Sequence, residues 1–306
     1  MTRTVRRLAG LLTLILALFM ATPLLAREDS ELVLGRISDS PKDTYVELKP
    51  LLDYVVPRMR DVGITSGRIL MAKDMSQMLG MVRRGQVDWV TETSGMGSLL
   101  HLKGGLVPIL ATDRSGVSNY YSIIFVRKDS GIRDLKELRG KKIAFQRPSS
   151  TSSFLLPADM LRREHLELQN IASPFDAVTP EGVGYIFAQS ETNILTWVHK
   201  RLVQAGALSN LDLNNSKFSK AFLADFNIIA RSAPVPRGLE LTSPQMSAAV
   251  RERLIQVLEQ AERDPKAAPA LRSYYRSSGF TRIDAAQRKE ITKLGRQMEQ
   301  LREALE

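Results

Sequence analysis

The sequence predicts an α/β protein built from two units in which strands and helices alternate. Short apolar runs rich in valine and isoleucine are followed by polar turns and then by segments with apolar residues at helical spacing. This order occurs over residues 32–111 and again from residue 140 to about residue 230, after which the chain is predicted to be helical. Strands that alternate with helices favour a mostly parallel sheet covered by helices.

The first unit is predicted to contain four strands, over residues 32–37, 68–71, 87–90 and 107–111. Ser38 to Pro41 supply capping residues for the first helix, and Asp74 is expected to cap the next one. A hydroxyl-rich turn, residues 91–94, precedes a third helix.

The second unit begins after an apolar run at residues 122–126 that leaves the first unit. Its strands are predicted at residues 142–145, 185–187, 204–208 and 226–230, and its helices at residues 153–163 and 191–201. We interpret the two crossings, near residues 120–125 and 229–234, as a paired hinge that permits two lobes to close over a ligand.

The remainder of the chain is predicted to be helical from Ser243, with Ser243 as N-cap and Pro244 at the first helical position. Asp284 is expected to cap a last helix. Its apolar residues are Ile291, Leu294, Met298, Leu301 and Leu305. Their spacing favours docking onto a lobe, and a dimer helix is the alternative.

The N-terminus has the pattern of a secretory signal peptide over residues 1–26. Arg3, Arg6 and Arg7 precede an uncharged apolar run, and Ala26 offers a small residue before the expected cleavage site. The apolar run is short for a membrane span, which needs roughly 20 residues, so we prefer a cleaved signal to an uncleaved anchor. This pattern predicts export to the periplasm.

Composition narrows the function classes. The chain has no cysteine, which excludes disulfides, thiolate catalysis and cysteine zinc sites. The net charge is +10, and three of these charges lie in the predicted signal, which has no acidic residue, so the mature chain carries +7. The sequence has no basic run interleaved with aromatic residues, which is the pattern typical of nucleic-acid-binding proteins. The surplus favours an anionic ligand, and a merely basic surface is the alternative.

Three hydroxyl-rich turns follow predicted strands, at residues 91–94, 149–153 and 209–210. In α/β sheets, ligands bind beyond the carboxyl ends of strands. Two of these turns also precede helices, whose N-terminal N–H groups attract anions. We therefore hypothesise that the turn of residues 149–153 binds a small oxyanion. The alternative is that these hydroxyl groups only cap helices.

No pattern indicates an enzyme. His101, His165 and His199 lie in predicted helices without acidic or hydroxyl partners at motif spacing. The chain lacks a nucleophile elbow, a phosphate loop and a His-Glu-x-x-His motif. We expect a non-catalytic binding protein with no cofactor and no metal.

Several runs resemble the phosphate, phosphite and phosphonate-binding proteins of ABC importers, the PhnD-like family. The runs are YYSIIFV (120–126), DSGI (129–132), DL (134–135), LRGK (138–141) and PSSTSS (148–153) with Pro157, together with GQVDW (85–89), AGA (205–207) and SAPVP (232–236). They cover most of the mature chain, and Ser150-Thr151-Ser152 is the most specific of them.

The resemblance implies a type II periplasmic binding protein fold, with two α/β lobes joined by a two-crossing hinge and followed by C-terminal helices. Lobe 1 would comprise residues 27–122 and 232–306, and lobe 2 residues 123–231. In the family the Ser-Thr-Ser turn binds phosphoryl oxygens, and an aromatic residue near the crossing lines the cleft. The site residues implied or suggested by position are Ser150, Thr151, Ser152, Ser153, Tyr120, Thr93, Ser94, Tyr45, Ser190, Glu191 and Asn210.

The chain also departs from the family pattern. Ser153 stands where the family usually has glycine, Ser190 and Glu191 stand where many members have histidine, and Gln204 replaces an aspartate. These differences disfavour an aminophosphonate. The resemblance implies capture of phosphate, phosphite or an alkylphosphonate and delivery to a membrane permease. The alternative is a periplasmic input module for a sensor kinase that uses the same cleft.

Overall fold

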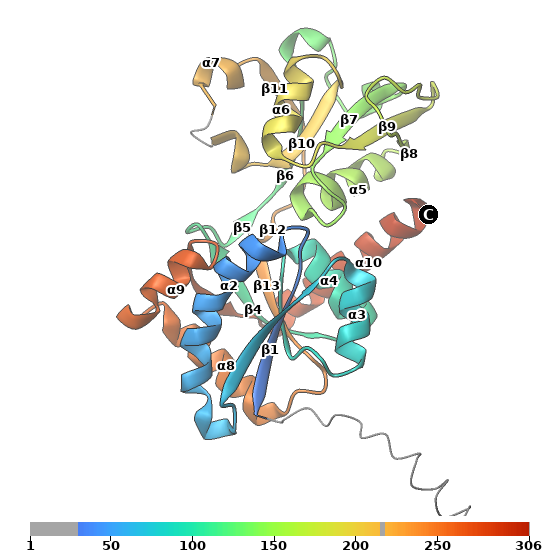
Figure 1. Cartoon of the computed structure of the whole chain (residues 1–306). Helices are drawn as coiled ribbons and strands as arrows, with labels where there is room; N and C mark the ends of the chain where they lie inside the picture. Colours follow the sequence, from blue (N-terminus) through green and yellow to red (C-terminus); the bar gives the residue numbers. More distant parts are fainter. Residues whose placement is uncertain (1–29, 215–217, 306) are drawn as a thin grey trace, which may run out of the picture.

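The computed structural model describes residues 30–214 and 218–305, and the predicted signal peptide lies outside these residues. The described chain forms two six-stranded sheets, each covered by helices, with a two-stranded ribbon between them (Figure 1). The α/β fold class with two lobes and a C-terminal helix is therefore confirmed.

The first sheet has the strand order β14-β4-β13-β3-β1-β2. Its strands are β1 (Glu31–Ile37), β2 (Ser66–Ala72), β3 (Trp89–Glu92), β4 (Val107–Arg114), β13 (Gly238–Thr242) and β14 (Ser277–Arg282). β1 pairs in parallel with β2 and β3, and the pairs that involve β13 and β14 are antiparallel.

The second sheet has the order β11-β6-β10-β7-β9-β8. Its strands are β6 (Ser122–Arg127), β7 (Lys141–Phe145), β8 (Glu167–Asn170), β9 (Gly182–Phe187), β10 (Ala205–Ser209) and β11 (Phe226–Arg231). β7 is parallel to β9 and β10, and β8 is parallel to β9, whereas β6 is antiparallel to both of its neighbours.

The expectation of mostly parallel sheets is wrong, because the sheets are mixed. The antiparallel strands include those that carry the chain out of one sheet and into the other: β4 and β6 at the first crossing, β11 and β13 at the second. A chain that passes directly between sheets has no crossover helix to return it in the parallel direction.

The crossings themselves pair with each other. β5 (Asn119–Tyr120) and β12 (Val235–Pro236) form the ribbon, in which Tyr120 lies opposite Val235. The ribbon therefore ties the two connections between the sheets together (Figure 1).

Helices cover both sheets. They are α2 (Pro41–Val55), α3 (Met75–Arg83), α4 (Ser94–Gly104), α5 (Leu156–Arg163), α6 (Glu191–His199), α7 (Lys220–Leu223), α8 (Ala248–Ala261), α9 (Ala268–Ser273) and α10 (Ala285–Leu305). A π-helical turn, η5 (Thr151–Leu155), leads into α5. Short 3₁₀ segments occur at Val56–Arg58, Arg60–Val62, Lys128–Ser130, Lys136–Leu138, Asp212–Asn214 and Pro265–Ala267.

Two predicted helix caps are confirmed. The Asp74 carboxylate accepts a hydrogen bond from the Gln77 amide at 2.8 Å, and Asp284 accepts one from the Gln287 amide at 2.7 Å. Each cap satisfies one of the free N–H groups in the first turn of its helix.

The predicted helix start at Ser243 is wrong. The amide of Ser243 donates to the Asp88 carbonyl at 2.7 Å, and its hydroxyl accepts from the Gln245 amide in a turn. The helix α8 begins later, with Ser247 as its cap. Strand β14 was also not predicted, because Phe280 is the one large apolar side chain among its buried residues, Ser277, Gly279 and Phe280.

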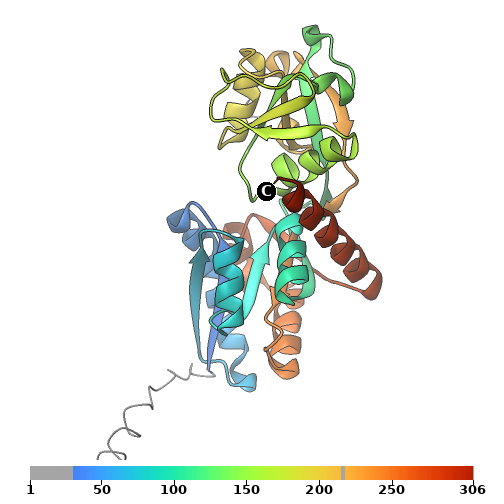
Figure 2. The same cartoon turned by 90° about the vertical axis from the view of Figure 1, so that its right-hand side faces the viewer.

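The last helix, α10, docks on both lobes, as Figure 2 shows. The residues Ile291, Leu294, Met298 and Leu301 are buried, and α10 packs on α4 of the first lobe and reaches α5 of the second. The helices α10 and α4 approach closely because Gly295 faces the Ser98 carbonyl, where a Cβ would lie 2.6 Å from the oxygen. Docking onto a lobe is thus confirmed.

We expect Gly295→Ala to destabilise the protein by about 1–3 kcal/mol, because the added methyl group meets rigid backbone. Glycine to alanine in a helix interior otherwise stabilises by roughly 0.5–1 kcal/mol, so the sign is diagnostic. Urea unfolding followed by circular dichroism measures the change, with exposed Arg296→Ala on the same helix as control. A Gly295→Ala protein as stable as the wild type would contradict this packing.

Candidate ligand-binding cleft

A polar cavity of about 450 Å³ lies between the two lobes, beside the ribbon. Residues of both lobes and of both crossings line it. They are Glu47, Thr93, Arg114, Ser115, Tyr120, Gln146, Arg147, Ser150, Thr151, Ser152, Glu191, Ser209, Asp212, Arg237, Arg272, Ser273, Tyr275 and Arg276. Six of the eleven predicted site residues are among them: Thr93, Tyr120, Ser150, Thr151, Ser152 and Glu191.

The Ser150 turn follows β7 and begins η5, as expected for a turn at the carboxyl end of a strand. The Ser150 hydroxyl caps η5 by accepting from the Ser153 amide at 3.2 Å. The Ser152 carbonyl accepts from the Ser122 hydroxyl at 2.5 Å. Ser153, which replaces the family glycine, is buried and donates to the Ala207 carbonyl, so its side chain faces the sheet and not the cavity.

The hydroxyl-rich turns of the two lobes meet each other. The Thr151 hydroxyl accepts from the Gly95 amide at 2.9 Å and donates to the Thr93 hydroxyl at 2.9 Å. A Cβ at position 95 would lie 2.8 Å from the Thr151 hydroxyl oxygen, so only glycine permits this approach. In this arrangement one N–H group at the start of α4 is satisfied by the opposite lobe.

Tyr120 lies in the ribbon, where it is 3% exposed. Burial raises the pKa of its phenol, while hydrogen bonds with the Thr151 and Ser152 side chains act in the opposite direction. The guanidinium carbon of Arg237 lies 4.9 Å from the centre of the Tyr120 ring. Tyr120 therefore contacts both the hydroxyl turn and a cation of the cavity.

The other five predicted residues do not line this cavity. Ser94 is buried with a hydroxyl that has no hydrogen-bond partner among the described residues. Ser190 caps α6, and Asn210 accepts from the Tyr121 amide at 3.0 Å. Tyr45 is 46% exposed on α2. The Ser153 hydroxyl donates to the Ala207 carbonyl of the sheet, as described above.

Sequence reasoning missed the arginines. Arg114, Arg237, Arg272 and Arg276 line the cavity, and in the described part of the chain none of the four forms an ion pair with a carboxylate. Arg114 is only 7% exposed, and the Nε–H groups of Arg114 and Arg237 are buried without a hydrogen-bond partner. They come from three separate segments of the chain, so no local sequence motif identifies them.

The buried Arg114 and the half-buried Arg237 influence each other through their charges. Burial lowers the pKa of Arg237, and the charge of Arg114 acts in the same direction, partly offset by Tyr120. Buried cations are costly unless paired. An anion placed between them would both satisfy the free N–H groups and relieve this repulsion.

The backbone beside Arg114 adopts a conformation that is rare for residues with side chains. Tyr275, Arg276 and Ser115 have φ values of 51°, 51° and 55°. The Ser115 amide donates to the Arg276 carbonyl at 2.9 Å. The Tyr275 ring lies 4.1 Å from the Arg114 guanidinium carbon and 5.1 Å from that of Arg36. Such strain concentrates at ligand-binding sites.

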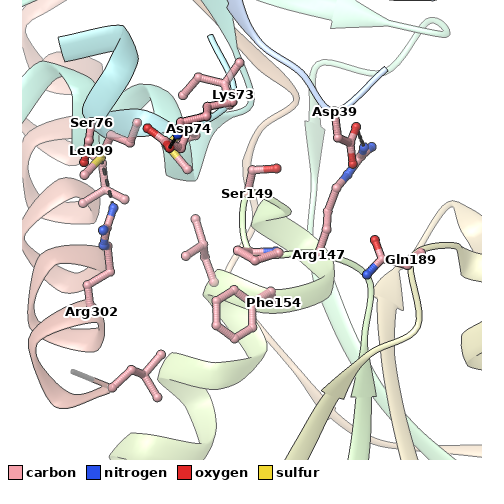
Figure 3. Close-up of a pocket in the computed structure, with 16 residues that line it drawn as sticks. Asp39, Lys73, Asp74, Ser76, Leu99, Arg147, Ser149, Phe154, Gln189 and Arg302 are labelled. Carbon is pink, nitrogen blue, oxygen red and sulfur yellow. Dashed lines mark hydrogen bonds and ion pairs between the residues drawn. The ribbon is translucent and has the colours of Figure 1, made fainter. Parts of the chain in front are cut away.

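A second, apolar cavity of about 440 Å³ lies on the α10 side of the lobe contact (Figure 3). Met96, Leu99, Phe154 and Leu155 line it, with Arg302 at one end. A smaller cavity of about 300 Å³ shares lining residues with both. Arg147 borders all three and pairs with Asp39 of the opposite lobe at 2.6 Å.

Over residues 30–214 and 218–305, no group of three or more histidine or acidic side chains could hold a metal ion. Within the same ranges no helix has the length and apolar character needed to span a membrane.

The chain was compared with known proteins. Residues 35–287 match the family described as ABC transporter, phosphonate, periplasmic substrate-binding protein. XAC2383 from Xanthomonas citri is 44% identical over 90% of this chain. Its chloride-bound structure has a TM-score of 0.84 and is covered over 99% of its length, and its ATP-bound structure has 0.85 and 100%.

More distant structures share the fold. PhnD1 from Prochlorococcus marinus, solved in complex with methylphosphonate, is 15% identical, with a TM-score of 0.63 and coverage of 88% of this chain and 98% of that one. Membership of a periplasmic binding protein family implies a periplasmic location. The match over residues 35–287 means that this chain belongs to the family of ABC transporter phosphonate periplasmic substrate-binding proteins.

Proposed function

We propose that this protein captures a phosphate-bearing anion with several negative charges, of which a nucleoside triphosphate is an example, between its lobes. It would then present the closed complex to the permease of an ABC importer. The observation that supports this proposal is the pair of cavity-lining guanidinium groups of Arg114, which is buried, and Arg237, which is half-buried; neither forms an ion pair with a carboxylate of the described residues. The guanidinium group binds phosphate with two parallel hydrogen bonds.

The number of arginines favours a ligand with more charge than a simple oxyanion carries. Four unpaired arginines line one cavity, against three acidic side chains, Glu47, Glu191 and Asp212. Of these three, Glu191 already accepts from the Gln146 amide group, and Asp212 accepts from both the amide and the hydroxyl of Ser209. Phosphate, phosphite and alkylphosphonates, which the hydroxyl turn by itself suggests, are the smaller competitors.

One solved relative also supports an anionic ligand. XAC2383, at 44% identity, is described bound to ATP in one structure and to chloride in another, and both ligands are anions. The methylphosphonate complex comes from a protein only 15% identical, so it bears on the fold and not on the ligand.

The cleft also has room for the organic part of such a ligand. The small cavity shares lining residues with the arginine-lined cavity and with the apolar one, which Figure 3 shows. In this proposal the phosphoryl groups lie against the arginines and the Ser150–Ser152 turn, and the uncharged part lies toward Arg147.

Closure would occur about the ribbon. We propose lobe 1 as residues 27–122 with 232–306 and lobe 2 as residues 123–231, because the two sheets divide near these positions. The ion pair between Asp39 and Arg147 and the contact between Thr151 and Gly95 both join the lobes. They would hold the closed form that docks on a permease. Nothing in the comparisons supports the sensor-kinase alternative.

We expect ATP and inorganic triphosphate to raise the melting temperature of the mature protein more than phosphate or methylphosphonate do. A ligand at 100 times its Kd adds about 2.7 kcal/mol of stability. Arg114→Ala and Arg237→Ala should each weaken binding at least about tenfold, as expected for a lost hydrogen bond to a charged group. Calorimetric titration of the mature protein measures the affinities.

Arg83→Ala removes the same charge from an exposed position on α3 and serves as the control. If methylphosphonate or phosphate binds more tightly than triphosphate and ATP, the proposed ligand class is wrong while the cleft stands. If the arginine variants bind like Arg83→Ala, the cleft itself is wrong.

Gly238→Ala should weaken triphosphate binding about tenfold and leave the fold intact. A Cβ at position 238 would lie 2.8 Å from the Arg114 Nε atom, so the Arg114 side chain must shift, and the three nearest atoms belong to this side chain and not to the backbone. Titration with triphosphate tests affinity, and thermal unfolding without ligand tests the fold. Unchanged affinity would mean that Arg114 does not contact the ligand from its observed position.

A further inference from the structure

A fully buried carboxylate, Glu240 of β13, lies behind the arginine-lined cavity. Four side chains donate to it. Trp89 donates to Oε2 at 2.7 Å, and Thr112, Tyr274 and Thr91 donate to Oε1 at 2.5, 2.6 and 3.1 Å. Among the described residues no lysine, arginine or histidine forms an ion pair with it. Its hydrogen-bond donors are all neutral groups, and the Arg36 guanidinium interacts with it through charge without forming an ion pair.

One route leads from Glu240 to the cavity through Thr91. The Thr91 hydroxyl donates to Glu240 and accepts from Arg114 Nη2 at 3.4 Å. The Thr91 and Tyr274 hydroxyl groups also hydrogen-bond to each other, so their two protons are shared among this contact and the two contacts with Glu240 Oε1. One hydroxyl group thus links Arg114 to this carboxylate, and the buried Arg114 Nε–H has no hydrogen-bond partner among the described residues.

A second route leads through Tyr274, which is fully buried. Burial, and after it the Glu240 carboxylate, holds the pKa of the Tyr274 phenol well above its usual value, so the phenol remains a donor. The next two residues are Tyr275 and Arg276, whose backbone is left-handed. Residues 274–276 form a corner of the backbone. The buried Tyr274 fixes the start of this corner, and the Tyr275 ring next to it packs against Arg114.

We infer that Glu240 is a positioning residue of the anion site, which acts through Thr91 and Tyr274 on Arg114. The inference rests on the proposed function and deepens it, because it names the group that orients the principal cation. A carboxylate that only tied β3, β4 and β13 together would need no link to cleft residues. Here two of its four partners lead to Arg114 or to the corner against which Arg114 packs.

A double-mutant cycle tests this inference on the mature protein, with inorganic triphosphate as the probe. Glu240→Gln keeps the shape of the side chain but turns an N–H group toward donors. We expect Glu240→Gln and Arg114→Ala each to weaken binding about tenfold or more. The double variant should bind within about twofold of Arg114→Ala, because residues in one network are not additive. A loss of stability alone would persist in both backgrounds.

Tyr54→Phe is the matched control, since it removes a hydroxyl donor from a different carboxylate, Asp264, and neither residue lines the arginine-lined cavity. It should lower the melting temperature and leave affinity unchanged. If Glu240→Gln does not fold, Tyr274→Phe takes its place in the cycle and removes one link to the same carboxylate.

Additive losses, or wild-type affinity in Glu240→Gln, would overturn the role of Glu240 and leave the proposed function intact. Failure of the wild-type protein to bind triphosphate or ATP would overturn the proposed function and this inference with it. The two failures are distinct, because the first is seen only among variants of a protein that binds.

Discussion

Arg114 is buried and Arg237 is half-buried beside the cleft, and the buried Nε–H groups of both find no acceptor in the described protein. This is the constraint on which the rest of the first lobe depends. Buried cations are tolerated only where the surroundings compensate for lost hydration. Here the compensation is indirect: Arg114 packs on Tyr275 and bonds Thr91, and Arg237 lies over Tyr120. A bound anion would complete it.

The position of β13 explains how so many groups reach one place. This strand lies between β3 and β4, and it follows directly on the second crossing. It carries Glu240 in the core, Gly238 under the Arg114 guanidinium, and it begins next to Arg237. One short strand therefore connects the hinge, the buried carboxylate and the cations of the cleft.

The contact between lobes is built differently, from neutral groups. Thr151 bonds Gly95 and Thr93, and the one nearby ion pair, between Asp39 and Arg147, is partly exposed. Hydrogen bonds between neutral groups and exposed ion pairs each contribute only about 1 kcal/mol or less. Such a contact suits lobes that must open again to release a ligand, whereas the charged groups that would hold the ligand lie on the first lobe and the crossings.

Sequence patterns alone predicted the alternation of strands and helices, the two crossings, the caps at Asp74 and Asp284, and the hydroxyl turn that begins η5. These are local: each depends on residues a few positions apart, where spacing and capping chemistry act directly. The resemblance carried by Ser150-Thr151-Ser152 also led to the family, which the match over residues 35–287 confirmed.

Three features are seen only in the tertiary structure: the mixed direction of the strands, the edge strand β14 and the cations of the cleft. Arg114, Arg237, Arg272 and Arg276 come from three segments far apart in the chain, and in a sequence of 43 basic residues nothing distinguishes them. They converge because β4 and β13 are paired and because α9 and β14 fold back on the same edge. Ser153, Ser190 and Asn210 look like site residues in the sequence, but the fold uses their side chains for a sheet contact, a helix cap and a link to the Tyr121 backbone.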